Sequence, residues 1–439
     1  MDQFIINGGK PLHGAVRLGG AKNASFKLMI AAALADSGQE SRLLNLSHIG
    51  DVEVTKKTLE ELGLHISTCG ERTLFIRTNG SNNPQVPQFA GEKSRGSTLF
   101  AGFLLSKLGE AIIPMPGGCC LGVRPVDRHL EALKSLGAHV EYKDNYIHLA
   151  CKQLVGSHFR FNKKTHTGTE AMIIAAVKAE GKTVIDNAGL EPEIDDLITF
   201  LNKMGAKIKR EAGDKIIIDG VKHLKGAIHR VMPDRNEAVS YAVAAIATKG
   251  DIVVENACKK DLECFLQKLE EAGGKFEISD YGIRFWYDGQ LKATDIKTAP
   301  EPGFMTDWQP LWGILMTQAQ GESSIIEAVH NNRLQYTHQL NQMGAKIELY
   351  NPSVDNPENY YEFDWVETDQ NMHAAKIIGP TPLKAGDHQI PDLRAGATLT
   401  IASLIAQGRS VLSNISHIDR GYEELDERLR QLGADIVRA

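Results

Sequence analysis

The stretch KSLGAHVEY, residues 134–142, decides the fold because variants of it occur six times along the chain. The other copies read EELGLHIS, NKMGAKIKR, EEAGGKFEI, NQMGAKIEL and RQLGADIVR, and the six central glycines are Gly63, Gly137, Gly205, Gly273, Gly344 and Gly433. Successive copies lie 74, 68, 68, 71 and 89 residues apart, which indicates one structural unit of roughly 70–75 residues repeated six times.

Each copy is typical of a helix that ends at its glycine and is followed by a strand. Leu130, Leu133 and Leu136 show the helical spacing of apolar residues ahead of Gly137, and the β-rich run HVEY follows. The other five copies have the same order. The repeat therefore predicts a surface helix followed by a strand in every unit.

A second helix is expected upstream of each copy. Six runs rich in alanine and aliphatic residues each end at a glycine, and they cover residues 23–38, 96–109, 168–181, 238–250, 311–321 and 396–408. These runs are apolar nearly all round, which is typical of buried helices. A short strand such as KTVIDNA follows each one.

The predicted fold class is α/β, with two similar domains of three repeated helix–strand units each. Within each domain, the three buried helices are expected to bundle inside, with sheets and surface helices around them. The 439 residues fit two cores of roughly 200 residues each.

Composition excludes several classes of protein. The formal net charge is -6, with acidic and basic residues interspersed, which argues against binding nucleic acid through bulk charge. The chain has no apolar run of the ~20 residues that a membrane-spanning helix needs, so no membrane insertion is expected. Its six cysteines include no CxxC pair, so we predict neither a metal site nor disulfides, and a cytoplasmic location.

Cationic side chains stand at the start of most of the predicted buried helices. The residues at these positions are Lys22 with Asn23, Arg95, Lys164 with His166, Arg235, Asp307 and Arg394. Helix starts favour anions, so cations gathered there favour a shared anion pocket. Solvated surface charge is the alternative. Asp307 is the acidic exception, and it is either a base for a bound hydroxyl or a helix N-cap.

The loop PMPGGCCLGVRP, residues 114–125, carries a thiol among prolines and glycines. Such a loop can close over a site. Cys119 lies five residues before Arg124, and a thiol near cations becomes reactive or proton-donating. The alternative for Cys119, and the favoured reading for Cys120, is a small buried apolar side chain.

Nine motifs spread along the whole chain resemble those of the enolpyruvyl transferases, within them the branch that acts on UDP-N-acetylglucosamine. They are AKN at 21–23, SRGS at 94–97, PGGCCLGVRPVD at 116–127, EPEI at 191–194, PDRNE at 233–237, TDWQ at 306–309, NNR at 331–333, PDLR at 391–394 and HIDRGY at 417–422. The cysteine loop is the most specific of these motifs.

The resemblance implies transfer of the enolpyruvyl group from phosphoenolpyruvate to the 3'-hydroxyl of UDP-N-acetylglucosamine, the first committed step of peptidoglycan synthesis. It implies an inside-out α/β barrel fold with one domain at 22–231, a second made of 1–21 and 232–439, and an active site in the cleft between domains. No metal or organic cofactor is implied.

The resemblance also implies roles for individual residues. Cys119 would protonate phosphoenolpyruvate and Asp307 would accept the proton of the sugar hydroxyl, with Lys22 and Arg394 completing the catalytic set. Phosphoenolpyruvate would be contacted by Lys22, Arg124 and Arg420, in a pocket lined by Arg95, Arg333 and Arg394. The nucleotide would lie against Arg124, Pro125, Val126, Asp127, Lys164, Thr165, His166, Thr167 and Gly168, and the sugar against Asn23 and Val329.

The match departs from the family pattern at Thr167–Glu170 and at Arg128, which bears on the acceptor more than on the enolpyruvyl chemistry. Glu170 near a diphosphate would repel it unless the carboxylate points away. Two alternatives therefore stay open: a divergent enolpyruvyl transferase with another acceptor, and a catalytically silent paralogue that binds nucleotide sugars and regulates. Inhibition by fosfomycin, an epoxide that mimics phosphoenolpyruvate, is a further expectation.

Overall fold

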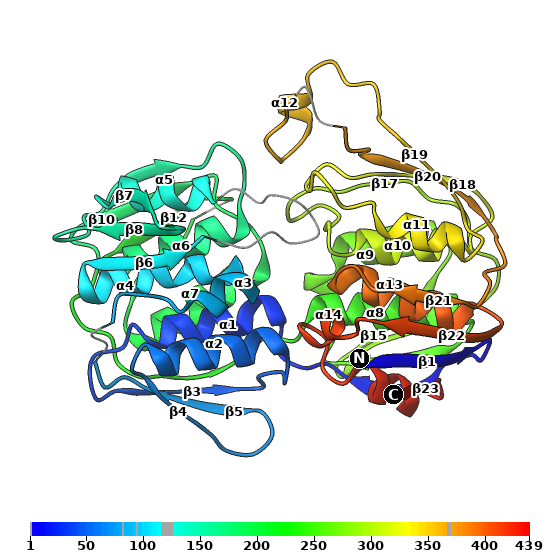
Figure 1. Cartoon of the computed structure of the whole chain (residues 1–439), viewed down its shortest axis with the longest axis horizontal. Helices are drawn as coiled ribbons and strands as arrows, with labels where there is room; N and C mark the ends of the chain where they lie inside the picture. Colours follow the sequence, from blue (N-terminus) through cyan, green and yellow to red (C-terminus); the bar gives the residue numbers. More distant parts are fainter. Residues whose placement is uncertain (1, 81–82, 94, 116–125, 212, 367–369) are drawn as a thin grey trace. The chain divides into compact units, whose positions relative to one another are not determined.

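The computed structural model describes residues 2–80, 83–93, 95–115, 126–211, 213–366 and 370–439, without the side chains of Lys93 and Arg95 (Figure 1). The described chain divides into two compact units. One contains residues 2–18 and 233–439, here the terminal unit, and the other contains 19–115 and 126–232, here the central unit.

In its described residues, the central unit contains three inner helices, three outer helices and three sheets. The inner helices are α1 (Lys22–Ala32), α4 (Phe100–Leu108) and α6 (His166–Ala176), the outer ones are α2 (Gly50–Glu61), α5 (Asp127–Ser135) and α7 (Pro192–Met204), and α3 (Gln88–Lys93) and η1 (Arg95–Leu99) precede α4. The strands are β3 (Glu40–Leu44), β4 (His65–Thr68), β5 (Thr73–Arg77), β6 (Glu110–Pro114), β7 (His139–Lys143), β8 (Tyr146–Ala150), β9 (His158–Arg160), β10 (Lys182–Asp186), β11 (Lys207–Arg210), β12 (Ile216–Asp219) and β13 (Ile228–Arg230). Their sheet orders are β13-β3-β5-β4, β6-β8-β7 and β11-β12-β10-β9.

The terminal unit repeats this plan. Its inner helices are α8 (Arg235–Ala247), α10 (Gln309–Met316) and α13 (Leu393–Ile405), its outer helices are α9 (Glu263–Glu271), α11 (Tyr336–Gln342) and α15 (Leu425–Gln431), and η2 (Lys259–Asp261), α12 (Pro357–Tyr360) and α14 (Ser416–Asp419) are short additions. The strands are β1 (Gln3–Gly8), β2 (His13–Arg17), β14 (Asp251–Glu255), β15 (Lys275–Ser279), β16 (Gly282–Trp286), β17 (Ile296–Lys297), β18 (Gly321–Ile326), β19 (Lys346–Tyr350), β20 (Ala374–Gly379), β21 (Asp387–Gln389), β22 (Gly408–Ser413) and β23 (Asp435–Arg438). Their sheet orders are β15-β16-β14-β2, β17-β18-β20-β19 and β21-β22-β1-β23.

The predicted repeat of buried helix, strand, surface helix and strands is confirmed. In the repeat that contains α6, for example, β9 precedes the helix in sequence, β10 follows it, and the two strands pair in parallel. The hairpin β11–β12 follows α7, and β12 pairs antiparallel with β10 in the same sheet. Helix α7 ends at Gly205, whose φ of 106° lies in the left-handed region that glycine adopts without strain. The other five repeat glycines also have positive φ.

Among the described residues, three strands pair with strands that are distant in the sequence. Strand β2 precedes α1 in sequence but pairs in parallel with β14, whereas β13 precedes α8 but pairs in parallel with β3. Strand β1, at the beginning of the chain, lies between β22 and β23. Each of these strands thus completes a sheet whose other strands come from a distant part of the chain.

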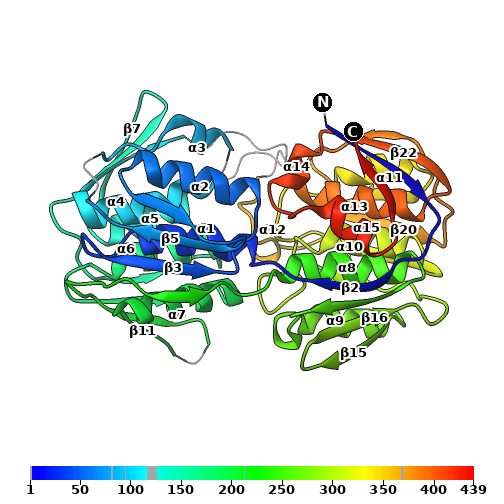
Figure 2. The same cartoon turned by 90° about the horizontal axis from the view of Figure 1, so that it is seen from below.

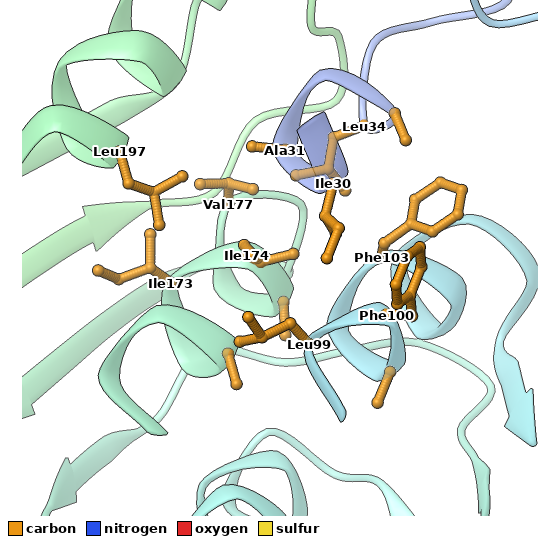
Figure 3. Packing of buried hydrophobic residues seen from close by; sticks show 14 of the residues in the cluster. Ile30, Ala31, Leu34, Leu99, Phe100, Phe103, Ile173, Ile174, Val177 and Leu197 are labelled. Atoms are coloured by element: carbon orange, nitrogen blue, oxygen red, sulfur yellow. The ribbon is translucent and has the colours of Figure 1, made fainter. Parts of the chain in front are cut away.

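The inner helices form the core of each unit. In the central unit, Ile30 on α1, Phe103 on α4 and Ile174 on α6 lie within one buried cluster (Figure 3). Gly102 allows α4 to approach α6, because a Cβ atom there would lie 2.9 Å from the carbonyl oxygen of Ala171. In the terminal unit the hairpin β15–β16 and α9 lie at the periphery, and α8, α10 and α13 lie toward the middle (Figure 2). No helix in the described part of the chain is long and apolar enough to span a bilayer.

Candidate active site

The charged residues that the sequence singles out lie in or beside the first turns of the inner helices. Lys22 and His166 are the first residues of α1 and α6, and Arg394 is the second residue of α13. Arg95 begins η1, and its side chain is outside the described residues. Asp307 precedes Trp308, the N-cap residue of α10, so the helix-cap alternative for Asp307 has no support from the position of the helix start.

Asp307 is held by two arginines from the same unit. Its Oδ1 lies 2.8 Å from an Nη of Arg333, and its Oδ2 lies 3.0 Å from an Nη of Arg394. Both arginine side chains are only 4% exposed, whereas the Asp307 side chain is 23% exposed. The carboxylate is therefore the accessible member of a cluster whose two positive charges lie behind it.

Arg394 is fixed from a second direction. Its other Nη donates to the hydroxyl of Tyr422 at 3.1 Å, and that hydroxyl lies 2.8 Å from the Ser240 hydroxyl. Burial alone would lower the pKa of Arg394, but Asp307 and Tyr422 outweigh burial and raise the pKa above its ordinary value. The cluster thus holds a permanently charged, oriented guanidinium, which suits recognition of a carboxylate or phosphate.

The side chain of Glu327 links, through hydrogen bonds, the segments that contain Asp307, Val329 and Arg333. Its Oε1 accepts hydrogen bonds from the Thr298 hydroxyl and from the backbone N–H groups of Val329 and His330, at 2.8–2.9 Å. Its Oε2 accepts a hydrogen bond from the Thr306 hydroxyl at 3.0 Å. Because Glu327 is 1% exposed, burial raises its pKa above the ordinary value for a carboxyl group.

Replacing Glu327 with leucine should therefore loosen these segments. Leucine would remove the acceptor of all four hydrogen bonds, and a buried donor left unpaired costs about 1–3 kcal/mol. We expect Glu327→Leu to lower the melting temperature and the activity together in thermal unfolding and rate measurements. Glu327→Gln is the matched control, because its amide oxygen can keep the three bonds at Oε1 while its amide nitrogen donates to Thr306. Equal losses in the two variants would contradict this role.

In the central unit, Lys22 pairs with Asp51 on α2. The Nζ of Lys22 lies 2.8 Å from Oδ2 of Asp51, and the two side chains are 14% and 5% exposed. Asn23 follows in the same turn of α1 and is partly buried. An ammonium group at a helix start opposes the helix dipole, and the Asp51 carboxylate offsets that cost.

The predicted nucleotide-binding residues 164–168 form the start of α6. Thr165 is the N-cap, and its hydroxyl accepts a hydrogen bond from the N–H of Gly168 at 3.2 Å. Lys164 pairs with Asp214 at 2.6 Å and lowers the pKa of that carboxyl group. The Thr167 hydroxyl lies 2.8 Å from Nε2 of His129 on α5. Local capping therefore fixes the backbone of this segment.

Lys27 and Glu170 form a buried ion pair beside His166. The Nζ of Lys27 on α1 lies 2.6 Å from Oε2 of Glu170 on α6, and the two side chains are 2% and 0% exposed. The ammonium group of Lys27 compensates the negative charge of Glu170 within the core, so an acidic residue can be accommodated beside the predicted diphosphate site. The sequence predicts both helices to be apolar nearly all round, and the exceptions Lys27 and Glu170 pair with each other.

The remaining predicted residues are spread over both units. Val126 is the buried N-cap of α5, and Asp127 is its exposed first residue. Val329 is partly buried in the terminal unit, and Arg420 follows α14 in that unit. The predictions for Cys119, Arg124 and Pro125 fall outside the described residues. Within the described residues, no group of three or more His, Cys, Asp or Glu side chains is placed to hold a metal ion.

The structure therefore brings together Asp307, Arg333 and Arg394 in the terminal unit, and Lys164–Gly168 in the central unit. Sequence reasoning assigned no role to Glu327, Lys27 or Tyr422, although Tyr422 is the last residue of the motif HIDRGY. Only Lys27 has a local signal, because a lysine within the apolar run of a buried helix needs a buried partner.

Comparison with known proteins identifies the family. The family model of EPSP synthase (3-phosphoshikimate 1-carboxyvinyltransferase) matches residues 6–429. The chain belongs to this enolpyruvyl transferase family.

Two relatives that are 39% identical to this chain have a name that differs from the description of the family model. UDP-N-acetylglucosamine 1-carboxyvinyltransferase 3 of Caldanaerobacter subterraneus is 39% identical over 438 residues, covering 100% of this chain and 99% of the relative. UDP-N-acetylglucosamine 1-carboxyvinyltransferase of Halothermothrix orenii is also 39% identical, covering 99% of each chain. The predicted family is thereby confirmed.

Solved structures match in fold. The enolpyruvyl transferase NikO from Streptomyces tendae has a TM-score of 0.86 at 22% identity, covering 100% of this chain and 99% of that one. EPSP synthase from Acinetobacter baumannii has a TM-score of 0.73 at 17% identity, covering 100% of both chains. At these identities the likeness confirms the predicted enolpyruvyl transferase fold alone.

Proposed function

We propose that the protein transfers the enolpyruvyl group of phosphoenolpyruvate to the 3'-hydroxyl of UDP-N-acetylglucosamine and releases phosphate. The observation that carries this proposal is the 39% identity, over the whole chain, to relatives named for that reaction. The cluster of Asp307, Arg333 and Arg394 supports it, because it pairs a base with two cations for an anionic donor.

The proposed reaction is an addition followed by an elimination. A proton is added to the methylene carbon of phosphoenolpyruvate, the sugar hydroxyl attacks the adjacent carbon, and Asp307 receives the hydroxyl proton. Loss of phosphate and of a proton from the methyl group then restores the double bond. The steps exchange protons and C–O bonds without a change of oxidation state, so no redox cofactor enters the proposal.

The roles of the other residues follow the family resemblance. Cys119 donates the first proton, and Lys22, Arg124 and Arg420 bind phosphoenolpyruvate, with Arg95 lining the same pocket. Residues Lys164–Gly168 bind the nucleotide, and Asn23 and Val329 contact the sugar. The reaction is proposed to be the first committed step of peptidoglycan synthesis, in the cytoplasm.

A phosphate-release assay tests this function. Purified protein is mixed with phosphoenolpyruvate and, in turn, UDP-N-acetylglucosamine, other UDP-sugars and UMP. We expect release above background only with UDP-N-acetylglucosamine, and loss of release in Asp307→Asn. Release with a different acceptor alone would replace the proposed acceptor. Binding of UDP-N-acetylglucosamine by calorimetry without any release would instead identify a regulatory nucleotide-sugar-binding protein.

The thiol assignment has its own test. We expect Cys119→Ala to lose alkylation by fosfomycin, measured as the covalent mass shift of the intact protein, because the thiolate is the nucleophile in such reactions. Cys120→Ala is the matched control, since it removes the neighbouring thiol from the same loop. Alkylation that survives in Cys119→Ala and disappears in Cys120→Ala would transfer the role to Cys120.

A further inference from the structure

His166 contacts the buried Lys27–Glu170 pair through one ring nitrogen. Its Nε2 lies 2.8 Å from Nζ of Lys27 and 3.2 Å from Oε1 of Glu170. Nδ1 has no partner among the described residues, and the side chain is 18% exposed at the first residue of α6. One nitrogen therefore faces the core, and the other is free to meet a ligand.

The lysine determines which nitrogen carries the proton in a neutral ring. An ammonium group donates hydrogen bonds and accepts none, so a neutral imidazole 2.8 Å from Nζ must offer the lone pair of Nε2. Its hydrogen then lies on Nδ1. The other tautomer would place the N–H of Nε2 against the ammonium group, donor against donor.

The charged ring gives the same result at Nδ1. Three ionisable groups act on His166 from the elements packed around it: Lys27 on α1, Glu170 on α6 and Glu191, the N-cap residue of α7. Burial and Lys27 lower the pKa of His166, whereas Glu170 and Glu191 raise it, and the pKa lies above its ordinary value. An imidazolium carries hydrogens on both nitrogens, and its Nε2–H has an acceptor in Oε1 of Glu170 at 3.2 Å, so Nδ1 is a donor in either charge state.

We propose that Lys27 is a positioning residue that keeps the proton on Nδ1 of His166, so that the ring always presents a hydrogen-bond donor to the anionic nucleotide of the acceptor. This inference rests on the proposed function, which places the nucleotide at residues 164–168. Lys27 itself is buried and acts only through His166. The chemistry that Nδ1 recognises is that of a phosphate or carbonyl oxygen.

Removing Lys27 should make acceptor binding sensitive to pH. In Lys27→Met the carboxylate of Glu170 remains as the sole partner of Nε2, so above the pKa of His166 the single ring proton moves to Nε2. Nδ1 then presents a lone pair to an anion. We expect KM for UDP-N-acetylglucosamine to rise about tenfold or more across the pKa in this variant, against about threefold or less in the wild type, with kcat nearly constant.

The double variant Lys27→Met/Glu170→Leu controls for a folding defect in Lys27→Met. It removes both members of the ion pair and leaves no buried unpaired charge, and it also removes the acceptor that draws the proton to Nε2. Neither tautomer is then enforced, and a bound anion can draw the proton to Nδ1, so the rise of KM with pH should be smaller than in Lys27→Met. A double variant as pH-sensitive as Lys27→Met would overturn the inference.

Ring ¹⁵N NMR separates this inference from the proposed function, because it needs no substrate. The His166 signals are assigned by their absence in His166→Asn, and the tautomer is measured above the pKa. We expect the proton on Nδ1 in the wild type and on Nε2 in Lys27→Met. A bare Nδ1 in the wild type overturns the inference outright. The expected tautomers without turnover of UDP-N-acetylglucosamine would leave the proton placement standing and refute the proposed function.

Discussion

Replacing Asp307 with asparagine is expected to lower kcat about 10²–10⁴-fold while both KM values change only a few fold. The carboxylate is the accessible member of its cluster and has two guanidinium partners, which pair with its ionised form, the form that a base needs. Asparagine has nearly the same shape but cannot accept a proton. Steady-state kinetics with both substrates, read by phosphate release, measures the effect.

The competing explanation is that Asp307 only holds two buried arginines in place. In that case Asp307→Asn would lower stability and raise KM for phosphoenolpyruvate, with kcat changed little. The kinetic constants distinguish the two explanations, because loss of the carboxylate charge beside two buried arginines should lower the melting temperature in either case. A loss confined to kcat identifies a base, whereas a rise confined to KM identifies a residue that only holds the arginines. Turnover retained within threefold would remove Asp307 from the catalytic set.

Replacing Arg394 with methionine is expected to raise KM for phosphoenolpyruvate about 10–100-fold. A charge-assisted hydrogen bond to a buried anion contributes about 1.5–3 kcal/mol, and Arg394 is held in one orientation by Asp307 and Tyr422 before any ligand arrives. Arg394→Lys keeps the charge but cannot reach both partners with one planar group, so it should give a smaller rise.

Arg235→Met is the matched control for Arg394→Met. Arg235 is also buried, also lies in the first turn of an inner helix, and also pairs with a carboxylate, that of Glu301 at 2.5 Å. Both variants remove a buried ion pair and should lower the melting temperature. Only Arg394→Met should raise KM for phosphoenolpyruvate. If KM for phosphoenolpyruvate rises equally in the two variants, the effect of Arg394→Met comes from lower protein stability and not from a lost contact with phosphoenolpyruvate.

The repeat and the helix classes could be predicted because their signals are local. Gly205 ends α7 with a positive φ that other residues rarely adopt, and the same residue type recurs in all six units. The inner helices carry apolar side chains on every face, and a helix of that composition must be covered on every side. Neither signal depends on what lies elsewhere in the chain.

The charged residues could also be assigned to helix starts from the sequence, because each stands just before an apolar run that predicts a helix. The structure adds that Asp392 caps α13 and Asp234 caps α8. The sequence could not reveal the partner of each charge. Asp307 and Arg394 are 87 positions apart and lie beside two different inner helices that pack together. Their contact depends on helix packing, which no local pattern encodes.

The chain alone therefore determined six similar units, their buried helices and the chemical character of the helix starts, because backbone angles and side-chain burial follow from neighbouring residues. Tertiary structure alone decided that β1, β2 and β13 complete the sheets of distant units, that Lys27 meets Glu170, and that Glu327 ties three segments together. Hydrogen-bond partners and ion pairs form between groups that meet only after the helices have packed.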